Sequence, residues 1–186
     1  MRVQLLYLLD ASSVIGVHDT YYPCDRVPEF WEWLEFQSRK GVCKIPPSIF
    51  AEIKPENEKF NSWIESNKKN LVLAKVEDLE LVRYVKAEGY GENLTEVEIE
   101  KIGADPFLIA SALEDRGHRC VVTHEISRPK RKRANRHIPD ICDQLGVSWM
   151  NTVDFINALD FKTRWQEDIP KQDLDLYLGP RKPQLF

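Results

Sequence analysis

The chain has 186 residues, of which 42% are hydrophobic and 30% charged, a composition typical of a soluble protein with a single domain. Its 26 basic and 30 acidic residues give a net charge of −4, so a nucleic-acid-binding role would depend on a local basic patch. The longest apolar run, Leu5 to Leu9, is too short for a membrane span or a signal peptide. The four cysteines are widely spaced, which indicates reduced core thiols and a cytoplasmic protein.

The apolar pattern predicts strands and helices in alternation. We expect strands at 3–9, 42–45, 119–123 and 147–150, an extended segment at 71–76, and helices at 28–39, 47–53, 57–69, 77–88, 96–102, 103–117, within 138–147 and at 152–159. This order favours an α/β fold, a three-layer α/β/α sandwich with a central, mostly parallel sheet. We expect the domain to span residues 1–160 and residues 161–186 to form a C-terminal extension or arm.

Four acidic residues lie in apolar surroundings near strand ends or helix starts. Asp10 follows the first predicted strand, Glu52 lies early in a helix, Asp105 is a candidate N-cap, and Glu125 follows the strand RCVVT. Open α/β sheets bind ligands at the carboxyl ends of their strands. Burying an isolated carboxylate costs several kcal/mol unless it is paired or binds a cation. Together the four acids favour a magnesium-type metal site.

Each acid also has a structural explanation that the sequence leaves open. Asp10 would suit a turn, Glu52 the surface of an amphipathic helix, and Asp105 a helix cap. Glu125, as a loop acid, needs no special explanation. Only the joint placement of the four residues raises the metal-site interpretation above these alternatives.

In chain order, LLDASSVI, PPSIFAEI, GADPFLIASAL and VVTHE resemble the signature of PIN-domain ribonucleases. That family has an Asp ending strand one, a Glu in an early helix, an Asp opening a helix of the form A-D-x-x-I-A-x-A, and an acid after a later strand. The resemblance covers residues 3–158, implies a PIN-like fold, and indicates a prokaryotic branch related to VapC-like toxins. The chain departs from the pattern where T-H-E replaces T-x-D, which makes Glu125 the fourth acid.

The resemblance implies an endoribonuclease that hydrolyses RNA phosphodiester bonds with one or two Mg²⁺ or Mn²⁺ ions. Asp10, Glu52 and Asp105 would hold the metal, and Glu125 would bind a second ion or a water. Ser12, Ser13 and Thr123 would orient a metal water or a phosphate, and His124 would act as a general acid, bind phosphate or simply be solvated. An antitoxin protein and a homodimer are further expectations from the resemblance.

The segment RPKRKRANR, residues 128–136, has six basic residues in nine and follows the predicted site. Lys and Arg side chains there would neutralise RNA phosphates, and a solvated loop is the alternative. The predicted RNA-binding residues are Lys130, Arg131, Lys132, Arg133 and Arg136.

Other classes of protein fit the sequence less well. An aspartyl-phosphate phosphatase would need a second acid at Ser12, and the cysteine spacing does not support a zinc-stapled protein. A catalytically inert PIN-like interaction module remains the main alternative. Trp31 and Trp33 lie on different sides of their predicted helix, so we expect one in the core and the other at an interface.

Overall fold

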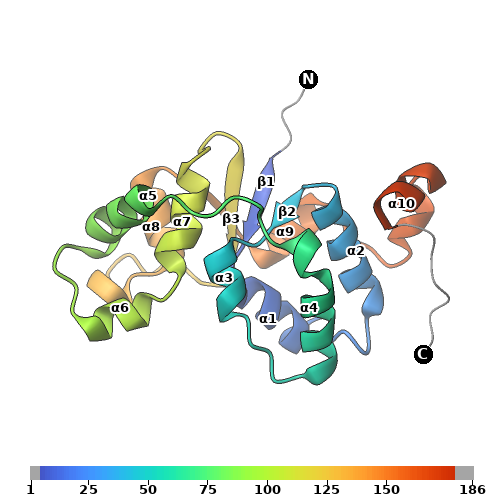
Figure 1. Ribbon diagram of the computed structural model, residues 1–186, viewed down its shortest axis with the longest axis horizontal. Helices are drawn as coiled ribbons and strands as arrows, with labels where there is room; N and C mark the ends of the chain where they lie inside the picture. Colours follow the sequence, from blue (N-terminus) through green and yellow to red (C-terminus); the bar gives the residue numbers. More distant parts are fainter. Residues whose placement is uncertain (1–4, 179–186) are drawn as a thin grey trace.

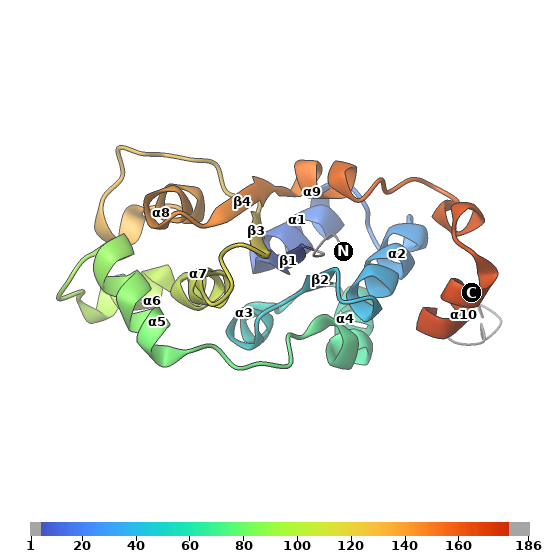
Figure 2. The same cartoon turned by 90° about the horizontal axis from the view of Figure 1, so that it is seen from above.

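The computed structural model describes residues 5–178, in which a parallel sheet lies between two layers of helices (Figures 1 and 2). The sheet order is β2-β1-β3-β4, and all of its pairings are parallel. The strands are β1 (Leu6–Leu9), β2 (Cys43–Lys44), β3 (Arg119–Thr123) and β4 (Ser148–Asn151). The predicted α/β class and layered architecture are therefore confirmed.

The helices form two groups, one on each face of the sheet (Figure 2). Helices α7 and α8 pack against β3 and β4 on one face, and α1, α2 and α9 pack on the other. The α-helices are α1 (Ala11–Thr20), α2 (Pro28–Arg39), α3 (Pro47–Glu52), α4 (Glu58–Leu71), α5 (Leu79–Val85), α6 (Glu96–Ile102), α7 (Asp105–Leu113), α8 (Ile138–Leu145), α9 (Thr152–Ala158) and α10 (Lys171–Leu178). A π-helix, η1 (Lys86–Tyr90), and the 3-10 helices η2 (Arg133–Asn135) and η3 (Trp165–Asp168) complete the list.

The two central strands explain why the site lies where it does. β1 (LYLL) and β3 (RCVVT) are almost entirely buried, as expected for parallel strands covered on both faces. The ladder between them runs to the pair Leu9 and Val122, and the Asp10 amide then donates to the Val122 carbonyl at 2.9 Å. Asp10 therefore lies at the carboxyl end of the sheet, next to the end of β3.

Helix α1 was not predicted, because its sequence, ASSVIGVHDT, has a weak helical pattern. Its buried face combines Val14 and Val17 with the polar residues Ser13 and His18. Periodicity depends on contrast between apolar and polar faces, and this helix shows little. The predicted helix at 77–88 also differs, since α5 continues into the π-helix η1 and ends at Tyr90.

Trp31 and Trp33 are both buried, so the expectation that one would lie at an interface is wrong. Trp31 packs against Trp63 of α4, with ring centroids 4.9 Å apart. Trp33 packs on the opposite side against Phe161, with centroids 5.1 Å apart. The chain after residue 160 therefore covers the Trp33 side of α2, so neither tryptophan lies at a surface.

The predicted C-terminal extension continues this cover (Figure 1). Trp165 is buried against Phe36 and donates its indole N–H to the Glu29 carbonyl at 3.1 Å. Helix α10 also packs against α2. Within the predicted extension, Trp165 is buried and α10 packs against α2 without a buried residue of its own, and residues 179–186 lie outside the described residues.

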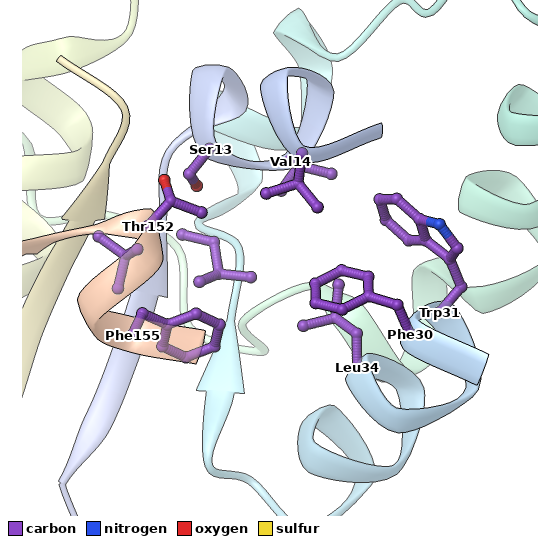
Figure 3. A pocket seen from close by; sticks show the side chains of 10 residues that line it. Ser13, Val14, Phe30, Trp31, Leu34, Thr152 and Phe155 are labelled. Atoms are coloured by element: carbon purple, nitrogen blue, oxygen red, sulfur yellow. The ribbon is translucent and has the colours of Figure 1, made fainter. Parts of the chain in front are cut away.

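The core behind Asp10 contains one small cavity between α1, α2 and α9 (Figure 3). Ser13 and Thr152 lie on the same side of it, and Phe30, Leu34 and Phe155 are among the apolar residues that line the rest. Its volume of about 10 Å³ leaves room for a single water at most. We therefore treat it as a packing defect and not as a ligand site.

Two further expectations concern the whole chain. Within residues 5–178, no helix is long and apolar enough to cross a membrane. Cys43, Cys120 and Cys142 are buried free thiols and Cys24 is half-buried, in agreement with the predicted reduced core thiols.

Candidate functional site

Asp10 is a buried carboxylate, 5% exposed, at the start of α1. Its Oδ2 accepts hydrogen bonds from the Ser12 hydroxyl and from the Thr123 hydroxyl, the latter at 3.0 Å. Burial raises the pKa of Asp10, and these hydroxyls oppose the rise. The Ser13 hydroxyl donates instead to the Asp10 backbone carbonyl at 2.7 Å. Ser12 and Thr123 therefore orient the carboxylate, while Ser13 fixes the backbone beneath it.

Glu52 is the last residue of α3, so the prediction that it lies early in its helix is wrong. Its Oε1 accepts a hydrogen bond from the Ala104 amide at 2.8 Å. Gly103 makes this approach possible, because a Cβ there would lie 2.7 Å from Oε1 and its φ of +48° disfavours other residues. Burial and the charge of Asp10 raise the pKa of Glu52, although the Ala104 amide lowers it.

Asp105 is the first residue of α7 and does not cap it, contrary to the sequence-based alternative. Ala104 occupies the N-cap position, and no side chain caps the helix there. The Asp105 Oδ2 instead accepts a hydrogen bond from the Tyr90 hydroxyl at 3.3 Å. Burial is the largest cause that raises the pKa of Asp105 well above its usual value, and the charges of the other three acids add to it.

Glu125 lies just beyond β3, and one hydrogen bond holds its backbone while another holds its side chain. Its amide donates to the Thr123 hydroxyl at 3.2 Å, and its Oε2 accepts from the Ile138 amide at 2.7 Å. Burial raises the pKa of Glu125, and so does the charge of Asp10, while the Ile138 amide and His137 lower it.

We call Asp10, Glu52, Asp105 and Glu125 the acidic cluster, because their charges raise one another's pKa values. Within residues 5–178, none of the four forms an ion pair with a basic side chain. In that same range, no three His, Cys, Asp or Glu side chains lie close enough to hold an ion as they stand. Each carboxylate is held instead by a hydroxyl or an amide.

The donor set of the cluster fits a hard divalent cation. Carboxylate oxygens are the ligands that Mg²⁺ and Mn²⁺ prefer. Burial is the main cause of the raised pKa values, and His137 is the one basic group that lowers any of them, at Glu125. Ion pairs with Lys or Arg do not compensate the four carboxylates within residues 5–178. A divalent cation would supply the compensating positive charge.

A cleft of about 530 Å³ opens beside Glu125. The Trp149 indole N–H donates to Asp143 at 2.7 Å, which fixes its ring in the cleft wall. The exposed side chains of His124 and Ile126 also line it. The other lining residues are Ser127, Asn151, Thr152, Val153 and Asp154.

The basic segment 128–136 divides into two parts. Arg133 pairs with Glu98, with its Nε 2.5 Å from Oε1, and Arg136 donates to the carbonyls of Gly89 and Asp140. Lys130, Arg131 and Lys132, which we call the basic tip, are exposed and have no side-chain partner among residues 5–178. Of the five predicted RNA-binding residues, these three are the ones whose side chains make no hydrogen bond or ion pair within the described part of the chain.

Tyr90, whose hydroxyl contacts the Asp105 carboxylate, was not predicted from the sequence as a residue of the site. Its side chain is 2% exposed, and burial followed by the charges of Asp105 and Glu125 raises its pKa well above the usual value. A tyrosine flanked by two glycines in GYG gives a turn signal only. Its approach to Asp105 depends on how α5, η1 and α7 pack, which no local pattern encodes.

The comparison with known proteins gives a family and no activity. Residues 7–163 match the family described as a domain of unknown function, DUF4411, and this range includes the whole acidic cluster. No curated protein matches the chain. Because the match covers most of the sequence, the chain belongs to the DUF4411 family.

Proposed function

We propose that this protein is an endoribonuclease that hydrolyses RNA phosphodiester bonds with Mg²⁺ or Mn²⁺ bound by the acidic cluster. The observation that carries the proposal is that the charges of Asp10, Glu52 and Glu125 all act on the buried Asp105, while none of the four acids pairs with a basic side chain among the described residues. A fold gains nothing in stability from such an arrangement, since buried like charges repel. Function is the simplest reason for it.

Asp10, Glu52, Asp105 and Glu125 would be the metal ligands. The bound cation would lower the pKa of a water molecule and stabilise negative charge on the phosphate. Ser12 and Thr123 would keep the Asp10 carboxylate in one orientation during the reaction. The Ala104 and Ile138 amides would do the same for Glu52 and Glu125.

The surroundings of the cluster suit a single RNA strand. The basic tip would neutralise backbone phosphates, and the cleft beside Glu125 offers the Trp149 ring as a wall for a base. His124 lines that cleft and is exposed, which suits contact with a phosphate.

The resemblance to PIN-domain ribonucleases supports the same reaction and extends the proposal. By that resemblance the protein would be the toxin of a toxin–antitoxin pair, located in the cytoplasm, with an antitoxin partner and a homodimeric form. A catalytically inert interaction module is the competing function, favoured by the absence of a preformed three-ligand group among residues 5–178.

The test is RNA cleavage by the purified protein with Mn²⁺ and with chelator. We expect Asp10→Asn to reduce cleavage by about 100- to 1,000-fold, as much as the loss of one hydrogen-bond donor that stabilises a transition state, because the cation would lose a charged ligand. Asp115→Asn is the matched control, because Asp115 pairs with His118 on the surface near the start of β3. Cleavage that persists in chelator, or in Asp10→Asn, would refute the proposal, and no cleavage by the wild type would favour the inert module.

A further inference from the structure

The π-helix η1 brings a buried hydroxyl to the acidic cluster. It follows α5 directly, and a π turn adds one residue to the helical repeat. Tyr90 is the last residue of this turn, 2% exposed, and its hydroxyl donates to Asp105 Oδ2 at 3.3 Å. Isolated π turns are uncommon in proteins, and those that occur are often found at functional sites. The contacts of this π turn indicate what it does.

Side chains from the region of α8 hold the π turn by its carbonyl groups. Arg136 Nη1 donates to the Gly89 carbonyl, and Gln144 Nε2 donates to the Glu88 carbonyl at 2.8 Å. Arg136 also contacts Gln144 and the Asp140 carbonyl, which ties the two donors to one frame. These bonds satisfy carbonyls at the end of a helix, where intrahelical partners run out.

The glycine in the turn lets it lie flat against α8. A Cβ at Gly89 would lie 2.7 Å from Ile141 Cγ2, closer than real Cβ atoms approach. The turn, Arg136, Gln144 and Ile141 therefore form one packed unit. Its effect on the site is to place the hydroxyl of the next residue, Tyr90, on one oxygen of Asp105.

We propose that Tyr90 is a positioning residue for Asp105 and that Arg136 and Gln144 hold the turn that carries it. The Tyr90 hydroxyl occupies Oδ2, and the other Asp105 oxygen accepts no hydrogen bond from residues 5–178, which leaves it available to a divalent cation. This inference rests on the proposed metal-binding function. It also assigns Arg136 a role in the metal site in place of the predicted contact with RNA.

Tyr90→Phe tests the inference, since it keeps the buried ring and removes only the hydroxyl. We expect Mn²⁺ to bind about 10- to 100-fold more weakly by calorimetry, the usual effect of losing an outer-shell partner of a ligand. Tyr84→Phe is the matched control, because Tyr84 lies on α5 with its side chain 46% exposed. Unchanged Mn²⁺ affinity in Tyr90→Phe would overturn the inference.

A double-variant cycle separates positioning from a loss of packing. In an Asp105→Asn background, Tyr90→Phe should cause little further loss of Mn²⁺ affinity, because both changes act on one contact. Equal losses in both backgrounds would show that Tyr90 acts elsewhere. If the wild type bound no Mn²⁺, the proposed function itself would fail, an outcome distinct from a wild type that binds normally beside an unaffected Tyr90→Phe.

Arg136→Lys tests the second half of the inference while keeping the charge. Lysine lacks the planar fork that reaches the Gly89 and Asp140 carbonyls together. We expect weaker Mn²⁺ binding with RNA binding in chelator unchanged. The reverse result, weaker RNA binding with normal Mn²⁺ affinity, would return Arg136 to the RNA surface and refute its assignment to the π turn.

Discussion

Two buried aspartates in this protein have opposite electrostatic surroundings. Asp10 and Asp140 have little exposed surface, 5% and 8%, but Asp10 lies much deeper beneath the surface than Asp140. Burial raises the pKa of Asp10. The negative charge of Asp10 in turn raises the pKa values of Glu52 and Asp105. Burial also acts on Asp140, but hydrogen bonds from Ser127 and the Arg128 amide and the nearby basic side chains lower its pKa overall.

The two aspartates differ in the groups that surround them. Asp140 has hydrogen-bond donors and basic side chains that stabilise its charge, and it has a structural role. Asp140 lies at the start of α8 and holds the beginning of the basic segment through Ser127 and Arg128. Asp10 lies at the start of α1, and its hydrogen-bond partners, the Ser12 and Thr123 hydroxyls and the Ala11 and Ser12 amides, are all neutral. The acidic cluster therefore carries negative charge that a bound cation would neutralise. Asp140 needs no cation, because neighbouring groups already stabilise its charge.

The largest expected contrast is in stability without divalent ions. Asp140→Asn should lower the free energy of unfolding by about 2 kcal/mol, since it weakens hydrogen bonds to a charged group. Asp10→Asn should raise the free energy of unfolding or leave it unchanged, because it removes a repelled charge and keeps an acceptor for Ser12 and Thr123. Urea denaturation at pH 7 in chelator measures both, and equal losses would break the comparison.

A second contrast separates the arginines and lysines of segment 128–136. Replacing Lys130, Arg131 and Lys132 with Ala should reduce the dependence of log RNA affinity on log salt by about 2, given about 0.7 for each phosphate contact on a single strand. Arg133→Ala should lower the melting temperature instead, since its partner is Glu98. Binding titrations in chelator at several salt concentrations decide this, and an unchanged slope in the triple variant would remove the basic tip from the RNA surface.

The smallest expected effect is in the pH dependence of stability in chelator. The pKa of Asp105 is raised above its ordinary 3.8, so its stabilising contribution is fully present below 3.8 and is lost as the pH rises through the raised value. Lowering the pH from 7 towards 5 should therefore stabilise the wild type relative to Asp105→Asn.

Glu98 should show the opposite pH dependence of stability, because its pKa is lowered where that of Asp105 is raised. Hydrogen bonds from Arg133 lower its pKa to about 2, so its contribution is present above 4.5 and is lost as the pH falls towards 2. Denaturation curves across pH 2–7 should show both trends. A difference between wild type and Asp105→Asn that did not change between pH 7 and 5 would contradict the raised pKa of Asp105.

Local sequence was sufficient for the strands and for most helices of this protein. Buried parallel strands are nearly all apolar, and β1 and β3 show this directly. The strand ends in turn located Asp10 and Glu125, because parallel strands end at one edge of a sheet. Helix α1 was missed because its buried face includes Ser13 and His18, which weakens the pattern.

Only the tertiary structure decided which polar groups meet. The hydroxyl on Asp105 comes from Tyr90, 15 residues earlier, and the amide on Glu52 comes from Ala104, 52 residues later. The pairing of Arg133 with Glu98 spans 35 residues. Sequence alone placed four acids in apolar surroundings, since burial follows from local composition, whereas their partners depend on packing between helices distant in the chain. Apart from the Ala11 amide and the Ser12 hydroxyl and amide on Asp10, the side-chain and amide donors described for the four carboxylates therefore come from residues at least 13 positions away in the chain.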